Sequence, residues 1–258
     1  MATATTTPRL FFLVVGAGLL AIPLAHRLSL TGRASAVMLH TSDERSPSTA
    51  AAGATTPSWL SVQADLNSRE GCSALVDAVA RHTDRLHGVV FTQDARSSSS
   101  LTDLAVPEFE RLMRLNAKAP WTITVALLPY LLKVRVRTRV LSPHSPTHSV
   151  IVQQQAKAAG EPAHVVIPGE HSSSPASAPC DVSFISKCAA SEIVRQLRHQ
   201  HPDVAFHSLS LEGFDLAQPA HSELLADELS LLCCTADAQS RHLVARTLVA
   251  HHQQQQQR

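Results

Sequence analysis

The segment Arg9–Ala25, RLFFLVVGAGLLAIPLA, decides the fold class of this chain. Its first part, Arg9–Val15, is a short apolar run that stops at a glycine, as buried parallel strands do. Gly16 and Gly18 then fit a GxGxxG/A pattern, and a helix is expected over about 20–30. In such a turn the backbone bends sharply and the helix N-terminus is aimed at phosphate groups. This order of strand, glycine turn and helix predicts a dinucleotide-type architecture.

Apolar, strand-like segments alternate with helical segments along the rest of the chain. Further strands are expected at 36–40, 59–64, 86–92, 163–167, 204–211 and 243–250. One helix is expected after a cap at Asn67, with Glu70 as its capping-box partner. The others are expected over Pro107–Lys133 in two pieces broken near Pro120, over Asp181–Gln200 and over Ser222–Cys234. This alternation predicts an α/β fold, a Rossmann-like, doubly wound parallel sheet of about seven strands with helices on both faces.

The length of 258 residues suits a single domain, which we expect over residues 1–250. Within it, Val134–Pro162 contains alternating arginines, the prolines of SPHSP and a glutamine run, which is typical of a long inserted surface loop. The tail 251–258, HHQQQQQR, is of low complexity. The expected organisation is therefore one domain with one long insertion on its surface.

Composition and charge exclude several functional classes. The formal net charge is +1, so the chain lacks the basic character expected of a nucleic-acid-binding protein. The five cysteines include no CxxC pair and match no zinc or disulfide framework, so we expect thiols in a reducing intracellular compartment. His144 and His148 have metal-like spacing, but they lie in a proline-rich stretch, and no metal site is predicted.

The apolar N-terminal region admits other interpretations. Leu10–Ala25 is shorter than the roughly 18–20 residues that span a bilayer, and it contains glycines and a proline. A membrane anchor there would also remove the first strand, so no membrane span is predicted. No acidic residue precedes Asp43 although arginines do, a composition compatible with mitochondrial import. The expected location is therefore the cytoplasm or the mitochondrion.

Several segments resemble the short-chain dehydrogenase/reductase (SDR) family, and the resemblance covers nearly the whole chain. ADLNSRE resembles the segment whose Asp contacts adenine, with Asp65 in place. The stretch Pro107–Leu131 places Asn116 on the family's structural and catalytic Asn. SFISKCAAS at Ser183–Ser191 resembles the YxxxK helix, with Lys187 on the Lys.

The resemblance implies a site at the carboxyl ends of the strands that takes NAD or NADP. Its implied cofactor-binding residues are Gly16, Gly18, Asp65 and Lys187, and its implied catalytic residues are Asn116 and Lys187. Asp43 suits a ribose hydroxyl and Arg45 a 2′-phosphate, which leaves NAD and NADP both open. The structural alternatives are a helix-kink hydrogen bond for Asn116 and a solvated or ribose-side position for Lys187.

The catalytic positions depart from the family's pattern. Ser183 stands where the family has its catalytic Tyr, and Tyr130 is the only tyrosine in the chain. Glu170 falls on the catalytic Ser, for which Ser172–Ser174 could substitute only by a register slip. A serine hydroxyl is shorter and far less acidic than a phenol, so we expect proton transfer from Ser183 to fail.

The cofactor-binding positions depart as well. Leu20 and Ile22 replace glycines of the family's TGxxxGxG turn, and we expect their side chains to obstruct a pyrophosphate. The NNAG motif becomes FTQD at 91–94, which lacks the closing glycine.

These departures together predict a catalytically inactive SDR-like protein that serves as a structural or regulatory subunit of an assembly and that could still take a dinucleotide. The family's usual oligomer interface implies a homo- or hetero-oligomer through helices 107–133 and 182–200. The alternative is an NAD(P)-dependent oxidoreductase for a carbonyl or hydroxyl substrate, with a rearranged site that uses Lys187, Asn116 and one of Ser172–Ser174. A membrane-anchored protein ranks last, and no particular substrate is predicted.

Overall fold

A single parallel sheet organises the molecule. The computed structural model describes residues 10–16, 19–30, 34–41, 59–97, 99, 102–134, 162–169, 182–209 and 218–234. In these residues the sheet has six strands in the order β3-β2-β1-β4-β5-β6. They are β1 (Leu10–Val15), β2 (Ala34–Thr41), β3 (Leu60–Gln63), β4 (Gly88–Phe91), β5 (His164–Pro168) and β6 (Ala205–Leu209). The predicted doubly wound parallel sheet is thereby confirmed; the seventh strand expected at 243–250 lies outside the described residues.

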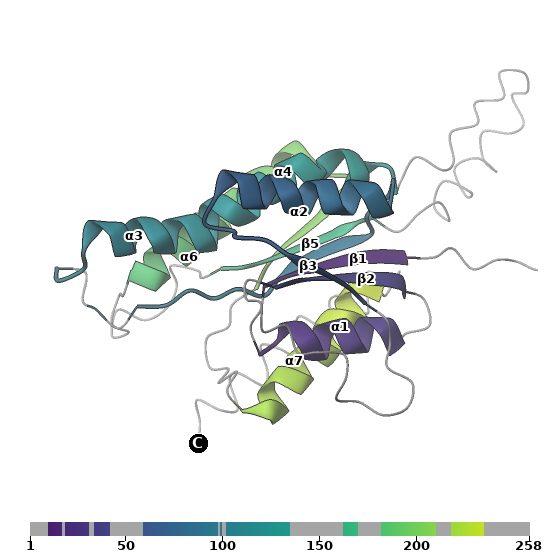
Figure 1. Ribbon diagram of the computed structural model, residues 1–258, viewed down its shortest axis with the longest axis horizontal. Helices are drawn as coiled ribbons and strands as arrows, with labels where there is room; N and C mark the ends of the chain where they lie inside the picture. The colour runs from purple at the N-terminus through teal and green to yellow at the C-terminus, as the bar shows by residue number, and fades with distance from the viewer. Residues whose placement is uncertain are drawn as a thin grey trace, which may run out of the picture.

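Helices cover both faces of the sheet (Figure 1). One layer consists of α2 (Arg69–His82), α3 (Val106–Met113), α4 (Ala119–Leu132) and α6 (Val182–Gln200). The opposite layer consists of α1 (Ala21–Leu30) and α7 (Pro219–Cys234). The chain runs outward from β1 to β3 and then returns to place β4 beside β1, so the strand order reverses between β1 and β4. In sheets of this kind, ligands bind beyond the carboxyl ends of the strands at such a reversal.

Strand β1 is apolar throughout because both of its faces are covered by helices. Phe11, Leu13 and Val15 join the core under α2, α4 and α6. Phe12 and Val14 point to the other face and join the core under α1 and α7. Burying each of these side chains stabilises the fold by about 1.5–3 kcal/mol, and alternation between two covered faces leaves no polar position in the strand.

Helix α2 begins one residue later than the sequence suggested. Its N-cap is Ser68, whose hydroxyl accepts a hydrogen bond from the Gly71 amide at 3.0 Å. Asn67, the predicted cap, instead donates its amide N–H and its side-chain N–H to the Asp65 carboxylate. The prediction of Asn67 as cap was therefore wrong, because the Asp65 carboxylate holds Asn67 in the preceding turn.

The long helical region after β4 is divided by a π-helical turn, η2 (Arg114–Lys118), rather than by a break at Pro120. The Ala119 amide donates to the Arg114 carbonyl, five residues back. Pro120 has no amide hydrogen, so it cannot donate to the carbonyl four residues before it, and the wider turn accommodates this loss. Pro120 lies in the first turn of α4, where a proline is tolerated.

Other boundaries shift in smaller ways. Helix α7 begins at Pro219, three residues before the predicted Ser222, because a proline is well placed at the first helical position. Residues 135–161 of the expected insertion lie outside the described residues. In the described part of the chain, no helix combines the length and apolarity that crossing a membrane requires.

Candidate functional site

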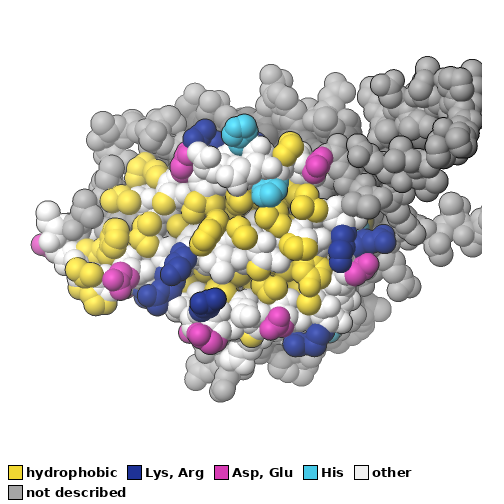
Figure 2. Space-filling view, turned by 90° about the horizontal axis from the view of Figure 1, so that it is seen from above, with side chains coloured by type: hydrophobic (Ala, Val, Ile, Leu, Met, Phe, Trp, Pro, Cys, Tyr) yellow, Lys and Arg dark blue, Asp and Glu magenta, His cyan; other side chains and the backbone are white. Residues whose placement is uncertain are grey.

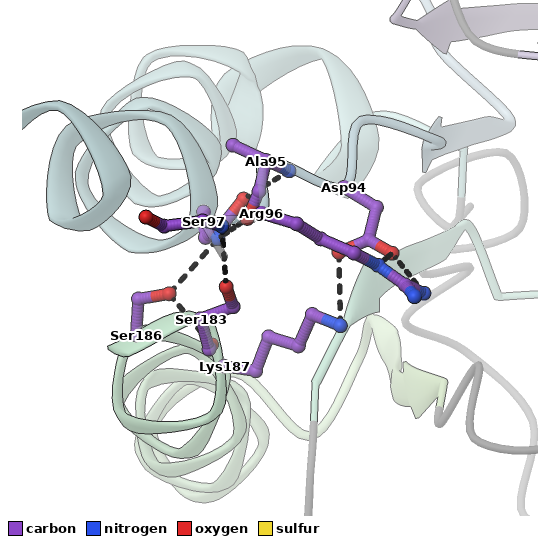
Figure 3. A network of polar contacts seen from close by, with 8 residues as sticks. Asp94, Ala95, Arg96, Ser97, Ser183, Ser186 and Lys187 are labelled. Atoms are coloured by element: carbon purple, nitrogen blue, oxygen red, sulfur yellow. Dashed lines mark hydrogen bonds and ion pairs between the residues drawn. The ribbon is translucent and has the colours of Figure 1, made fainter. Parts of the chain in front are cut away.

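The candidate site lies where β4 ends, between η2 and the first turns of α6. Figure 3 shows its polar network, in which the segment 94–97 after β4 faces the side chains of α6. Lys187 and Ser183 are one helical turn apart on α6, so both point to this segment. Asn116 approaches it from η2. The structure thus brings together the two predicted catalytic residues, and it brings Ser183 beside them.

Lys187 is paired with a carboxylate of the chain itself. Its Nζ lies 2.9 Å from Oδ1 of Asp94, and the two side chains are 8% and 9% exposed. Arg96 contacts the second carboxylate oxygen, with Nη2 at 2.6 Å and Nε at 2.7 Å. A buried charge needs such compensation, because its loss of hydration is otherwise unfavourable. Asp94 therefore accounts for how a lysine is tolerated in this interior position.

The charge state of Asp94 follows from these neighbours. Burial alone would raise the pKa of its carboxyl, but Lys187 and Arg96 favour the anion and lower the pKa below its ordinary value. The site thus contains a fixed carboxylate between two cations at neutral pH.

Asn116 connects three parts of the site. Its Oδ1 accepts a hydrogen bond from the Ala95 amide at 3.0 Å. Its Nδ2 donates to the Ala95 carbonyl at 2.8 Å and to Oγ of Ser186 at 2.9 Å. The side chain is buried, so these bonds replace the water that the amide would otherwise bind. Through these hydrogen bonds, Asn116 connects η2 with the segment after β4 and with α6.

Ser183 is also engaged in a structural contact. Its hydroxyl accepts a hydrogen bond from the Ser97 amide at 3.1 Å, and its side chain is buried. One turn further along, Oγ of Ser186 donates to the Ser183 carbonyl at 2.8 Å. The segment 94–97 is thus attached to α6 at both of its ends, by Lys187 to Asp94 and by Ser183 to Ser97.

Gly16 is placed by close packing beside β4. Its φ is +130°, and a Cβ there would lie 2.6 Å from Oγ1 of Thr92 and 2.8 Å from the Gln93 amide nitrogen. The carbonyl of the preceding Val15 accepts from the Thr92 amide at 2.8 Å. Only glycine fits this conformation and this approach. Gly18, the second predicted glycine, lies outside the described residues.

The other predicted cofactor residue, Asp65, is exposed after β3, and its Oδ1 accepts from both N–H groups of Asn67. At the start of α1, Leu20 is buried in the core, so it is not the side chain that would meet a ligand. Leu19 and Ile22 are the exposed side chains there. The expected obstruction by Leu20 is therefore not seen, because its side chain packs between α1 and the sheet.

These positions allow a test of fit for the dinucleotide that the resemblance implies. Of the implied cofactor residues in the described part of the chain, Lys187 faces Asp94, Asp65 binds Asn67, and Gly16 is filled by its neighbours. The Asp94 carboxylate engages the Lys187 ammonium that the resemblance would have bind a ribose hydroxyl. Among the described residues, it is thus Lys187 that does not fit a dinucleotide as placed, because Asp94 occupies the ammonium that would bind the ribose.

Several predicted residues lie outside the part of the chain that the structure describes. They are Glu170, Ser172–Ser174, Asp43, Arg45, His144 and His148. Among the residues that the structure does describe, no group of three or more His, Cys, Asp or Glu side chains could hold a metal ion.

Asp94 is not among the residues predicted for the site. In the sequence its position stands out by the absence of the family's closing glycine, and a charged residue directly after a buried strand was a usable indication. A lysine predicted to lie in the interior requires a counter-charge, and Asp94 is a carboxylate beyond the end of β4, on the side of the sheet where Lys187 was expected.

Comparisons with known proteins agree with this architecture. The chain matches the carbonyl reductase Sniffer of Caenorhabditis elegans, as that structure is described, with a TM-score of 0.62, 15% identity, and coverage of 84% of this chain and 89% of the other. An SDR-family oxidoreductase from Brucella ovis, in complex with a partially ordered NAD, gives a TM-score of 0.60, 14% identity, and coverage of 90% and 96%. A metagenomic short-chain oxidoreductase in complex with NADP gives a TM-score of 0.60, 16% identity, and coverage of 90% and 93%.

Identities this low establish the fold alone. No curated protein sequence matches the chain. The sequence model of the family described as short chain dehydrogenase, however, matches residues 11–152, which is more than half of the chain. This match, with which the strand order agrees, shows that the chain belongs to the short-chain dehydrogenase family.

Proposed function

We propose that this chain is a catalytically inactive member of its family that serves as a structural or regulatory subunit of an assembly. The observation that carries the proposal is the contact made by Ser183. Ser183, which the sequence resemblance aligns with the family's proton-donating Tyr, is buried, and its hydroxyl accepts a hydrogen bond from the Ser97 amide. The residue that would have to release a proton is used to hold the segment after β4.

The chemistry of the residue leads to the same proposal. A general acid works best when its pKa lies near the operating pH. A phenol has an unperturbed pKa of about 10, and an aliphatic alcohol is far less acidic. In the family, the neighbouring Lys makes the Tyr more acidic; here the charge of Lys187 is compensated by Asp94. Ser183 therefore lacks both the acidity and the electrostatic support that proton transfer needs.

An apolar surface on α3 and α4 supports the second half of the proposal. Helix α4 contains no charged residue. One side packs on the sheet, while Trp121 and Val125 on the other are 45% and 41% exposed. Val106 and Phe109 extend the exposed apolar surface along α3. Figure 2, which looks onto this layer, shows apolar side chains gathered in the middle, with charged side chains of both signs around them.

Such a surface is typical of a protein–protein interface. Aromatic residues are enriched in the centres of interfaces, and charged residues are depleted there. We propose that the chain assembles as a homo- or hetero-oligomer through the helical stretches 107–133 and 182–200. Cys72, Cys188 and Cys233 are free thiols, which agrees with a reducing compartment, the cytoplasm or the mitochondrion.

The second candidate function is an NAD(P)-dependent oxidoreductase with a rearranged site. The observation that favours it is the convergence of Asn116 and Lys187, the two predicted catalytic residues, on one segment. Two of the similar structures contain bound NAD or NADP, which agrees with this alternative.

Turnover assays separate the two candidates. Purified full-length protein is mixed with NADH or NADPH and a panel of aldehydes and ketones, and cofactor oxidation is followed. We expect no oxidation above the rate without protein. Oxidation that the Lys187→Ala variant abolishes would overturn the inactive assignment and establish the oxidoreductase.

The assembly is tested by light scattering after size exclusion. Trp121→Glu combined with Val125→Glu is expected to convert the oligomer, or its complex with a partner, to the monomer. Leu231→Glu is the matched control, because Leu231 is 48% exposed on α7, in the opposite layer. Assembly that survives the double substitution would reject α4 as the interface.

A further inference from the structure

We infer that Asp94 is a built-in ligand of Lys187 that closes the cofactor end of this site, so that a single side chain prevents nucleotide binding. The inference concerns binding, whereas the proposed function concerns turnover and assembly. It rests on the proposed function only in taking the site as the family's former cofactor site. It assigns to Asp94 a role that family membership does not provide.

The contact of Lys187 with Asp94 is stronger than a contact with a neutral cofactor group would be. The ammonium of Lys187 and the carboxylate of Asp94 are 2.9 Å apart and almost fully buried. Charge-assisted contacts of this kind are stronger than those between neutral groups. A ribose hydroxyl is neutral, so it cannot compete for the ammonium on equal terms. A phosphate could compete by charge, but it would have to approach the Asp94 carboxylate.

Asp94 cannot easily move aside, because the backbone on both sides of it is hydrogen-bonded. On its N-terminal side, the Thr92 amide is bonded to the Val15 carbonyl of β1 at 2.8 Å. On its C-terminal side, the Ala95 backbone is bonded at both its amide and its carbonyl by Asn116. Ser183 fixes the Ser97 amide one residue beyond Arg96. The backbone that carries Asp94 is therefore held from three directions.

Arg96 holds the Asp94 carboxylate in its orientation toward Lys187. Its guanidinium contacts the second oxygen of the Asp94 carboxylate at 2.6 Å. The carboxylate is thus held by two cations from different sides, as Figure 3 shows. Rotating it away from Lys187 would disturb both contacts. The same cations keep its pKa low, so protonation near neutral pH does not open the site.

The test removes the negative charge and measures nucleotide binding. Thermal unfolding of full-length wild type, Asp94→Asn and the matched control Asp84→Asn is recorded with and without millimolar NADH or NADPH. Asp84 is a suitable control because its carboxylate is 76% exposed and is paired with Arg85 before β4. We expect no shift for the wild type and the control, and a rise in the melting temperature of Asp94→Asn with at least one cofactor. The corresponding gain in affinity should be tenfold or more.

Two results would overturn the inference. One is a wild type that either cofactor stabilises as much as it stabilises Asp94→Asn. The other is a folded Asp94→Asn variant that responds to neither cofactor. The double variant Asp94→Asn/Lys187→Met completes the set: it should fold and show no response, because the inferred ligand group is gone. A response in the double variant would also reject Lys187 as the group that Asp94 occupies.

A measurement on the wild type covers the case in which Asp94→Asn does not fold. The ammonium resonance of Lys187 is identified by its loss in Lys187→Met and followed by NMR during a titration with NADH. We expect it to stay unchanged, and a change on addition of NADH would overturn the inference. Cofactor binding without turnover would reject this inference and leave the proposed inactivity standing, whereas turnover would reject the proposed function itself.

Discussion

Helix α6 takes part in two ion pairs that differ in burial and in the separation of their partners along the sequence. Near its start, Lys187 is paired with Asp94 from another segment, and their side chains are 8% and 9% exposed. About two turns later, Arg195 is paired with Glu192 of the same helix, and their side chains are 66% and 54% exposed. The first pair joins α6 to the end of β4. The second links two neighbouring positions on one helix.

The difference in burial between these two ion pairs explains why one of them fixes the position of α6 at the site and the other does not. Charges in water are screened, and exposed pairs contribute little to stability. A buried charge is tolerated only with its partner in place, so removing one member is strongly unfavourable. The face of α6 that is turned to the site is therefore fixed by the chain, whereas the exposed face can lose the Glu192–Arg195 pair with little effect on stability. A residue that matches a family's catalytic pattern can thus be retained for packing.

Asp94→Ala should have the largest effect on stability, because it removes one member of the buried pair. Lys187 would keep its burial and lose that carboxylate, and we expect the free energy of unfolding to fall by about 3–5 kcal/mol. Urea denaturation followed by circular dichroism measures the loss. The double variant Asp94→Asn/Lys187→Met should recover most of it, because a neutral pair needs no counter-charge. Equal stability of wild type and Asp94→Ala would show that the pair is not buried in solution.

Asn116→Ala should have the next largest effect. It removes the three hydrogen bonds that join η2 to Ala95 and Ser186, and it leaves the part-buried Ala95 backbone groups and the buried Ser186 hydroxyl without these partners. We expect a loss of about 2–3 kcal/mol, since unsatisfied buried polar groups are costly. Amide hydrogen exchange at Ala95 should also accelerate. Asn116→Asp is the matched control, because it can accept from the Ala95 amide but cannot donate to the Ala95 carbonyl.

Much of the fold follows from the sequence because its apolar periods are strong. The run in β1 and the alternation of strands and helices suffice to predict a parallel sheet with two helical layers. The sequence does not settle which of two adjacent capping residues is used. Asn67 and Ser68 are both good caps, and the Asp65 carboxylate selects between them through a turn.

The site is predictable only in part, for a related reason. The positions of Asn116, Ser183 and Lys187 follow from matches to family motifs. Their partners do not, because the contact of Lys187 with Asp94 joins residues far apart in the sequence. The same holds for the contact of Ser183 with Ser97. Such contacts depend on how α6 lies against the end of β4, which no local pattern encodes.

Acid should weaken the buried pair. Burial tends to raise the pKa of Asp94, but Lys187 and Arg96 outweigh it, and the net pKa lies below the ordinary value of 3.8. A carboxyl with a lower pKa in the folded state stabilises the fold above its unfolded pKa, and this contribution is lost as pH falls through the folded pKa. Wild type should therefore lose stability below about pH 4 more steeply than Asp94→Asn/Lys187→Met. Equal slopes in thermal unfolding against pH would contradict this.

Ser183→Ala should have a smaller effect. It removes one hydrogen bond to the Ser97 amide, and we expect the free energy of unfolding to fall by about 1 kcal/mol. Assembly measured by light scattering should be unchanged, because the hydroxyl is buried and so is not part of the surface that a partner would contact. A change in assembly with the fold intact would show that Ser183 does more than hold this segment.

Glu192→Gln should have the smallest effect, and it completes the comparison. Hydrogen bonds from Arg195 and then Gln196 lower the pKa of Glu192 to about 2, which taken alone suggests a strong interaction. The pair is exposed, however, so water and salt screen it, and holding two long side chains in one geometry opposes the gain. We expect the urea midpoint to match that of wild type at low and at high salt. If Glu192→Gln weakened the fold as much as Asp94→Ala does, burial would not be what separates the two pairs, and the fixed character of the site would need another cause.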